Sequence, residues 1–148
     1  MSITWNSNFS IGVSLIDDQH KKLVEILSEL VDAQKMGTGA QIIQDIMDRL
    51  VDYTVYHFSS EEQLFEEYRY PKAAEHKDEH DEFTSKVKMY QYSCKSGNLI
   101  LSMKILDYLK DWTISHILGT DKEFAAYLLA KELSRDDLRE VLNIEGEY

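Results

Sequence analysis

One long stretch of the chain, residues 40–68, contains neither glycine nor proline and repeats apolar side chains at helical spacing. Steps of three and four residues place one set of its side chains on a single face of an α-helix. This set consists of Ile43, Ile46, Met47, Leu50, Thr54, His57, Glu61 and Phe65. Because the whole chain has only 1 proline and 6 glycines, long helices joined by few turns are predicted throughout.

Residues that start and stop helices divide the chain around this stretch. A first helix is predicted to begin near Asp17 or Asp18, either of which can cap it, and to end at the glycines of residues 37–39. Pro71 ends the second helix and suits the start of a third, which reaches about Cys94.

The second half of the chain continues the helical pattern. A fourth helix is predicted to begin near Leu99, and Gly119 is a point at which it can be distorted or interrupted. Ser134, with Asp137 three residues later, is typical of the start of a short last helix. The first dozen residues are expected to form an extended arm that packs its aromatic side chains onto the body. The sequence thus predicts an all-α, antiparallel up-down four-helix bundle with an N-terminal extended arm and a short C-terminal helix.

Length and charge limit the organisation and the partners. The chain of 148 residues fits one domain, expected over residues 1–133, with 134–148 as a helical extension that is either a docking helix or the remnant of a linker. The net charge of −11 disfavours nucleic acid and anionic membrane surfaces as partners. The single cysteine, Cys94, allows no intrachain disulfide, and neither a membrane span nor a signal peptide is recognisable, so we expect a cytoplasmic protein without membrane insertion.

All five histidines fall on or beside the apolar stripes of the four predicted helices: His20, His57, His76, His80 and His116. Residues four apart on an α-helix are separated by about 40° around its axis and about 6 Å along it. His57 and Glu61 therefore project from one face, as do His76 and His80. A lone core histidine is more often a hydrogen-bonded structural residue than a ligand. Five on four inward faces instead favour one shared partner, a metal, because unpaired polar groups are costly to bury.

The number of candidate ligands favours two ions over one. Imidazole and carboxylate ligands suit Fe, Zn, Cu or Ni, but five histidines and Glu61 exceed what a tetrahedral zinc site uses. Asp121 is a candidate second bridge, although it lies five residues after His116, about 140° around an ideal helix. The two share a site only if the backbone near Gly119 widens. The alternative is that Asp121 is an exposed acid on a solvated face.

These residues stand in motifs that resemble the hemerythrin family, in particular the single-domain bacteriohemerythrins. The resemblance runs from Trp5 to about Leu133, nearly the whole chain. The matching motifs are Asp18-Gln19-His20, His57-Phe58-Ser59-Ser60-Glu61-Glu62, Tyr70-Pro71, His76-x-x-x-His80, and Asp111-Trp112 leading to His116-x-x-x-x-Asp121. One short motif would be weak evidence, but the full set in order uses every histidine in the chain.

The resemblance implies a non-haem di-iron centre with a bridging oxo or hydroxo group. One iron would be coordinatively saturated, and the other would keep an open position at which O2 binds reversibly as a peroxide. The implied ligands are His76, His80 and His116 on the saturated iron, His20 and His57 on the other, and Glu61 and Asp121 as bridges. The implied function is O2 storage, delivery or buffering rather than enzymatic catalysis.

The resemblance also implies an apolar wall around bound O2. Leu23, Phe58, Trp112 and Ile117 stand where the family has such residues, and they also serve to pack the core. Thr113 departs from the pattern, because the family usually has leucine three residues before the fourth-helix histidine. A hydroxyl there can bond to bound peroxide or admit water, so we expect faster autoxidation to the di-ferric state than leucine would allow. Alternatively, it bonds to a backbone carbonyl one turn back and presents only its methyl group.

Three other functions remain open from the sequence. An O2 or redox sensor would need a separate partner or a longer parent protein, because no output domain is recognisable, and the sequence identifies no protein partner. A di-iron oxidase, peroxidase or nitric-oxide-handling protein is less favoured, because such bundles usually use more glutamates at Glu-x-x-His spacing. A structural zinc bundle is disfavoured by the excess of ligands.

Overall fold

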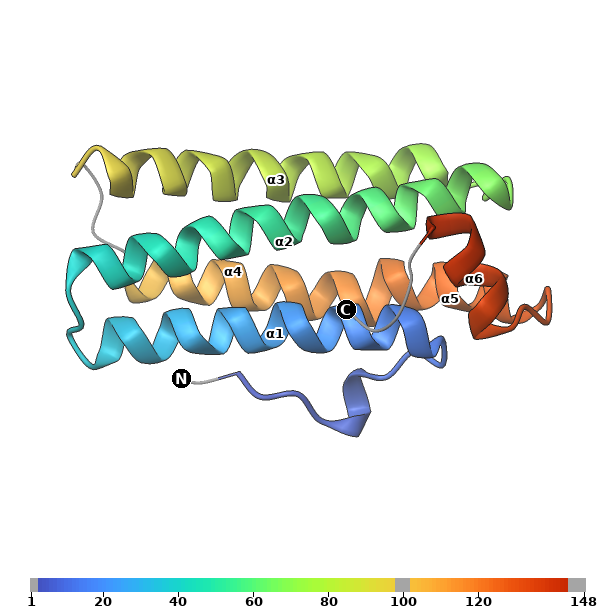
Figure 1. Cartoon of the computed structure of the whole chain (residues 1–148), viewed down its shortest axis with the longest axis horizontal. Coiled ribbons are helices and arrows are strands. Elements are labelled where there is room, and N and C mark those ends of the chain that lie inside the picture. The colour runs from blue at the N-terminus through green and yellow to red at the C-terminus, as the bar shows by residue number, and fades with distance from the viewer. Residues whose placement is uncertain (1–2, 98–101, 144–148) are drawn as a thin grey trace.

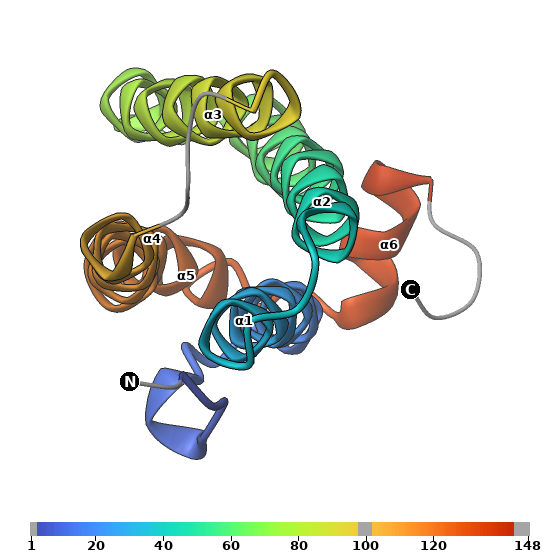
Figure 2. The same cartoon turned by 90° about the vertical axis from the view of Figure 1, so that its left-hand side faces the viewer.

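The computed structural model describes residues 3–97 and 102–143, and within these ranges all regular secondary structure is helical. Four long elements run antiparallel, one after the other, and form a bundle (Figure 1). Viewed end on, α1 lies between α2 and α4, and α3 lies on the far side (Figure 2). The bounds are α1 Ser14–Lys35, α2 Ala40–Glu67, α3 Ala73–Lys95 and α4 Met103–His116, which continues through a π-turn, Ile117–Asp121, into α5 Lys122–Leu129. The predicted four-helix bundle is confirmed.

The start of α1 differs from the prediction. The helix begins at Ser14, after the extended residue Val13, so neither Asp17 nor Asp18 is its cap. Asp17 lies in the first turn, where its carboxylate accepts hydrogen bonds from the Ile11 amide at 2.9 Å and the Ser10 hydroxyl at 2.6 Å. Asp17, one of the two residues predicted to cap the helix, therefore binds the preceding arm to the helix.

The other boundaries lie close to their predicted positions. Helix α2 ends at Glu67, and Pro71 lies in the turn two residues before α3. The predicted fourth-helix start, Leu99, falls outside the described residues. From Ser102 onward the helix is described, and the Ser102 hydroxyl caps it by accepting from the Ile105 amide at 3.3 Å.

The predicted N-terminal arm is interrupted by one 3-10 turn, Ser7–Phe9, and it runs beside α1 (Figure 1). Trp5 packs against the core while staying half-buried. The aliphatic side chains of Ile3 and Ile11 are buried more deeply. The arm is therefore anchored by aliphatic side chains as well as by the aromatic residues that the sequence singled out.

A short helix, α6 (Arg135–Leu142), packs outside the bundle against α1 and α2 (Figure 2). It begins with the expected capping box, in which Ser134 and Asp137 exchange hydrogen bonds of 2.9 and 3.1 Å. Within α6, the Leu138 side chain is buried, and Arg135 pairs with Asp18 of α1 at 2.7 Å. The described part of the C-terminal extension is thus docked on the bundle.

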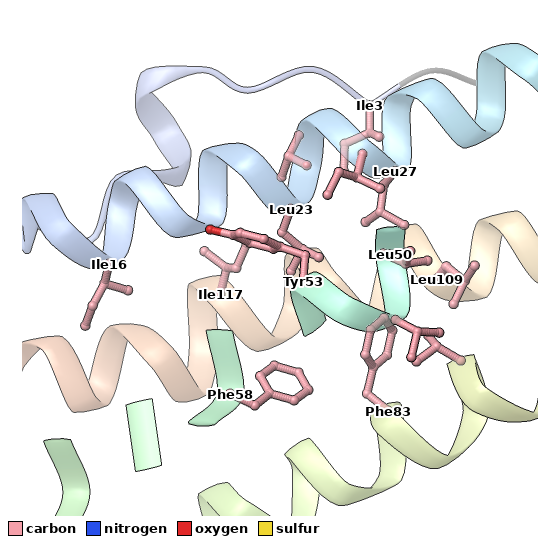
Figure 3. Close-up of a cluster of buried hydrophobic side chains, with 14 of the residues drawn as sticks. Ile3, Ile16, Leu23, Leu27, Leu50, Tyr53, Phe58, Phe83, Leu109 and Ile117 are labelled. Atoms are coloured by element: carbon pink, nitrogen blue, oxygen red, sulfur yellow. The ribbon is translucent and has the colours of Figure 1, made fainter. Parts of the chain in front are cut away.

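The core runs along the axis between the four helices. Leu23, Leu50, Phe83 and Leu109 are among its buried side chains (Figure 3). The buried ring of Phe124 on α5 also belongs to it and meets the Phe65 ring edge-on, with centroids 4.6 Å apart. Among the described residues, none of the helices combines the length and apolar character needed to cross a membrane.

Candidate metal centre

The structure brings all seven predicted ligands into one buried volume between the helices. Each of the seven is at most 4% exposed. Ligand atoms lying within 4.8 Å of one another form two overlapping groups, and Glu61 and Asp121 belong to both. The larger group is Glu61, His76, His80, His116 and Asp121, and the smaller is His20, His57, Glu61 and Asp121. Three histidines therefore face one side of the carboxylate pair and two face the other.

The π-turn explains how Asp121 reaches this volume. An ideal α-helix would turn Asp121 about 140° away from His116. The π-helical residues Ile117–Asp121 place an extra residue in the turn, which returns Asp121 to the face of His116. Asp121 Oδ1 lies 3.1 Å from His116 Nε2 and 2.8 Å from His76 Nε2. The alternative that Asp121 is an exposed surface acid was wrong.

The spacing of the inward nitrogens and oxygens fits shared metal ions. His20 Nε2 lies 2.8 Å from Asp121 Oδ2. His80 Nε2 lies 3.1 Å and His57 Nε2 lies 3.4 Å from Glu61 Oε1. Two ligands about 2.1 Å from one ion, at right angles to each other, lie roughly 3.0 Å apart. The observed separations are therefore those of neighbouring positions on a common ion.

Several of these atoms have no hydrogen-bond partner among the described residues, although they are buried. They are Nε2 of His20, His57 and His80, both Glu61 oxygens and Asp121 Oδ2. Leaving a buried polar atom unpaired costs about 1–3 kcal/mol, and more for a charged group. A metal ion would satisfy the whole set at once, so the residues present fit a metal site.

Burial and neighbouring charged groups shift the pKa values of the acids and imidazoles of the centre. Burial, with the nearby Asp121 carboxylate, raises the pKa of Glu61. Burial alone would also raise the pKa of Asp121, but His116 and His20 hold it well below its usual value. Burial and the neighbouring His20 hold the pKa of His57 well below its usual range. Neutral imidazole and ionised carboxylate are the forms that bind metals, and a cation between the two acids would relieve their repulsion.

The outer nitrogens of three histidines are held by residues to which the sequence reasoning assigned no role, although two of them stand in the matching motifs. Gln19 Oε1 lies 2.7 Å from His57 Nδ1. Glu62 lies 2.9 Å from His80 Nδ1, and Glu79 lies 2.9 Å from His116 Nδ1. Such partners fix the imidazole tautomer, which here leaves Nε2 facing inward. Each is adjacent in sequence to a ligand or its motif, which is the only signal that could have identified it.

The five predicted pocket residues surround the centre unevenly. Phe58 stacks on His80, with ring centroids 3.9 Å apart, and Trp112 stacks on His116 at 4.5 Å. Both of these aromatic rings therefore cover the three-histidine group. Leu23 and Ile117 are buried in the same cluster of apolar side chains as Phe58 (Figure 3).

The Thr113 side chain is buried, and its hydroxyl is already engaged. It donates a hydrogen bond of 2.8 Å to the Leu109 carbonyl, one turn earlier in α4. Of the two alternatives open from the sequence, this is the second, in which a backbone carbonyl takes the hydroxyl. Thr113 differs from leucine at this position chiefly in its smaller volume.

Comparisons with known proteins agree with this geometry. The chain matches the model of the hemerythrin HHE cation binding domain over residues 11–128. It is 36% identical over 123 residues to a bacteriohemerythrin of Stenotrophomonas maltophilia, which covers 83% of this chain and 79% of the relative. A bacteriohemerythrin of Pseudomonas aeruginosa is 32% identical over 136 residues, or 92% of this chain and 86% of the relative. A solved wild-type hemerythrin superposes with a TM-score of 0.79 at 30% identity, over 84% of this chain and 95% of that one. The chain therefore belongs to the hemerythrin family.

Proposed function

We propose that this protein holds two iron ions at the centre and binds O2 reversibly at the ion held by His20 and His57. The observation that carries the proposal is the unequal division of histidines between the two groups that share Glu61 and Asp121. An ion held by three imidazoles and two carboxylates has one protein ligand more than its neighbour. The neighbour is therefore the ion that keeps a position for a small ligand. When bound, the irons would supply the electrons that hold O2 reversibly.

The roles of the chain's own residues follow from their contacts. Gln19 holds His57 through its outer nitrogen, so that Nε2 stays directed inward. Leu23 and Ile117 are at most 2% exposed and keep bulk water away from the centre. Because the side chains of Leu23, Phe58 and Ile117 carry no proton donor, they would favour release of intact O2 over its further reduction. These features support a carrier or buffer more than an oxidase.

An anaerobic spectrum tests the proposal directly. Protein reduced with dithionite under argon, and then freed of reductant, should be nearly colourless and should contain two irons per chain, one for each ligand group. Admitting air should produce a visible charge-transfer band that disappears under renewed argon. If air produces only an irreversible di-ferric spectrum, the carrier proposal fails and a sensor or oxidase is favoured. If metal analysis gives one iron or fewer, the di-iron assignment fails.

Thr113 should affect how fast the oxygenated protein autoxidises. Replacing it with leucine adds apolar volume beside the centre and should slow autoxidation severalfold, measured as the decay of the charge-transfer band in air. Because the hydroxyl already bonds to Leu109, Thr113→Val, which keeps the volume and removes only the hydroxyl, should autoxidise like the wild type. An unchanged or faster rate in Thr113→Leu would contradict the expectation.

A further inference from the structure

The carboxylate of Glu79, on α3, contacts residues at both ends of the π-turn. Glu79 Oε1 lies 2.9 Å from His116 Nδ1, directly before the turn. The Thr120 hydroxyl, directly before Asp121, donates to the same carboxylate, 2.8 and 2.9 Å from its two oxygens. Glu79 thus ties together the residue that precedes the π-turn and the residue that precedes the second shared carboxylate.

We propose that Glu79 and Thr120 are a positioning pair that holds the π-turn open and thereby directs Asp121 into the centre, between the two groups of histidines. The role in metal binding rests on the proposed function, whereas the role in holding the turn does not. Neither residue faces the ligand volume directly. Glu79 acts through His116 and through the backbone at Thr120.

The π-turn needs such support because a regular α-helix competes with it. π-Helical turns are rare, and they occur mostly as single turns inside α-helices. Close packing against the rest of the molecule does not require a glycine at position 119, since a Cβ atom built there would meet nothing within 4 Å outside the nearby backbone of its own helix among the described residues. Besides the contacts of Asp121 with His76 and His116, the bonds from His116 and Thr120 to Glu79 are available to stabilise the wide turn against a continuous α-helix.

Glu62 provides an internal comparison. It also holds the outer nitrogen of a histidine, His80, at 2.9 Å, but both residues lie on regular α-helices, α2 and α3. Loss of Glu62 should disturb one imidazole and leave the π-turn intact. Loss of Glu79 should disturb both the imidazole and the turn. The two glutamates therefore separate the effect of orienting a ligand from the effect of holding the backbone.

Hydrogen exchange of the metal-free full chain tests the backbone role without any metal chemistry. In Glu79→Ala and in Thr120→Val, amide exchange across residues 117–122 should become at least tenfold faster, while exchange in the middle of α2 stays unchanged. Thr120→Ser keeps the hydroxyl and should exchange like the wild type. Glu62→Ala and the exposed-acid control Asp78→Asn should also leave the π-turn unchanged. If Glu79→Ala does not fold, Thr120→Val alone decides the result.

Cobalt(II) titration of the same variants tests the consequence for the centre. Loss of an outer partner of a metal-ligating histidine typically costs 10–100-fold in affinity, and Glu79→Ala should reach at least the loss seen in Glu62→Ala. Thr120→Val, which touches no imidazole, should still weaken cobalt binding. Wild-type exchange rates in both Glu79→Ala and Thr120→Val, or wild-type cobalt affinity in Thr120→Val, would overturn the proposal. Failure of the wild type itself to bind two ions would instead refute the proposed function, and the exchange result would stand on its own.

Discussion

Replacing Asp121 with asparagine should reduce the metal content from two ions per chain to one or fewer, because Asp121 belongs to both ligand groups. The amide keeps the size of the side chain and removes the charge and one ligand oxygen. Loss of outer partners alone costs 10–100-fold in metal affinity, so loss of a shared ligand should cost on the order of 100-fold or more. Metal analysis after dialysis and cobalt(II) titration both measure this.

The matched control is Asp111→Asn, which makes the same chemical change at an exposed position of α4. It should retain the full metal content and affinity. Circular dichroism of both metal-free variants shows whether the helices are intact. If Asp121→Asn folds and still binds two ions with wild-type affinity, Asp121 does not bridge them.

Much of the fold could be predicted because helical periodicity records which face of each segment is buried. The apolar stripe through Ile43, Leu50 and Phe65 predicted the bounds of α2 to within about one residue. Ser134 with Asp137 predicted the capped start of α6. The predicted cap of α1 was wrong because an aspartate near the start of a helix can accept hydrogen bonds either from the helix or from the residues that precede it. Asp17 accepts from the arm that precedes it and not from its own helix.

In the candidate site, some residues could be predicted from local helix geometry, whereas others depend on contacts between helices. The pairs His57 with Glu61 and His76 with His80 follow from α-helical spacing alone. Asp121 required a departure from that spacing, and a single glycine in the sequence indicates only that a departure is permitted. Its cause lies partly in Glu79 on another helix. Contacts between segments distant in sequence leave no periodic signal, so helical spacing could not reveal the role of Glu79, and its place next to His80 in the sequence was the only hint.

Replacing Phe83 with alanine should produce the largest loss of stability among single core substitutions at the centre. Phe83 is fully buried on α3, and its ring stacks on Trp112 with centroids 4.2 Å apart. It also meets Phe58 edge-on at 6.1 Å. Truncating a buried phenylalanine costs about 3–5 kcal/mol in the free energy of unfolding, because it loses apolar burial and leaves a cavity. Urea denaturation of the metal-free protein should show this loss.

The position of Phe83 predicts a second effect, on the metal centre. Trp112 and Phe58, which Phe83 supports, lie flat against His116 and His80. A cavity behind both rings would let these imidazoles move, so the metal-loaded variant should also lose cobalt(II) faster to a chelator. Phe83→Leu fills most of the cavity and should lie between the variant and the wild type in both measurements. Met47→Ala removes a fully buried side chain of α2 that lies ten residues before His57, about 15 Å along the helix, and it should lower stability while leaving the rate of metal loss unchanged. Equal rates of metal loss in Phe83→Ala and Met47→Ala would show that the aromatic layer stabilises the bundle without holding the ligands in place.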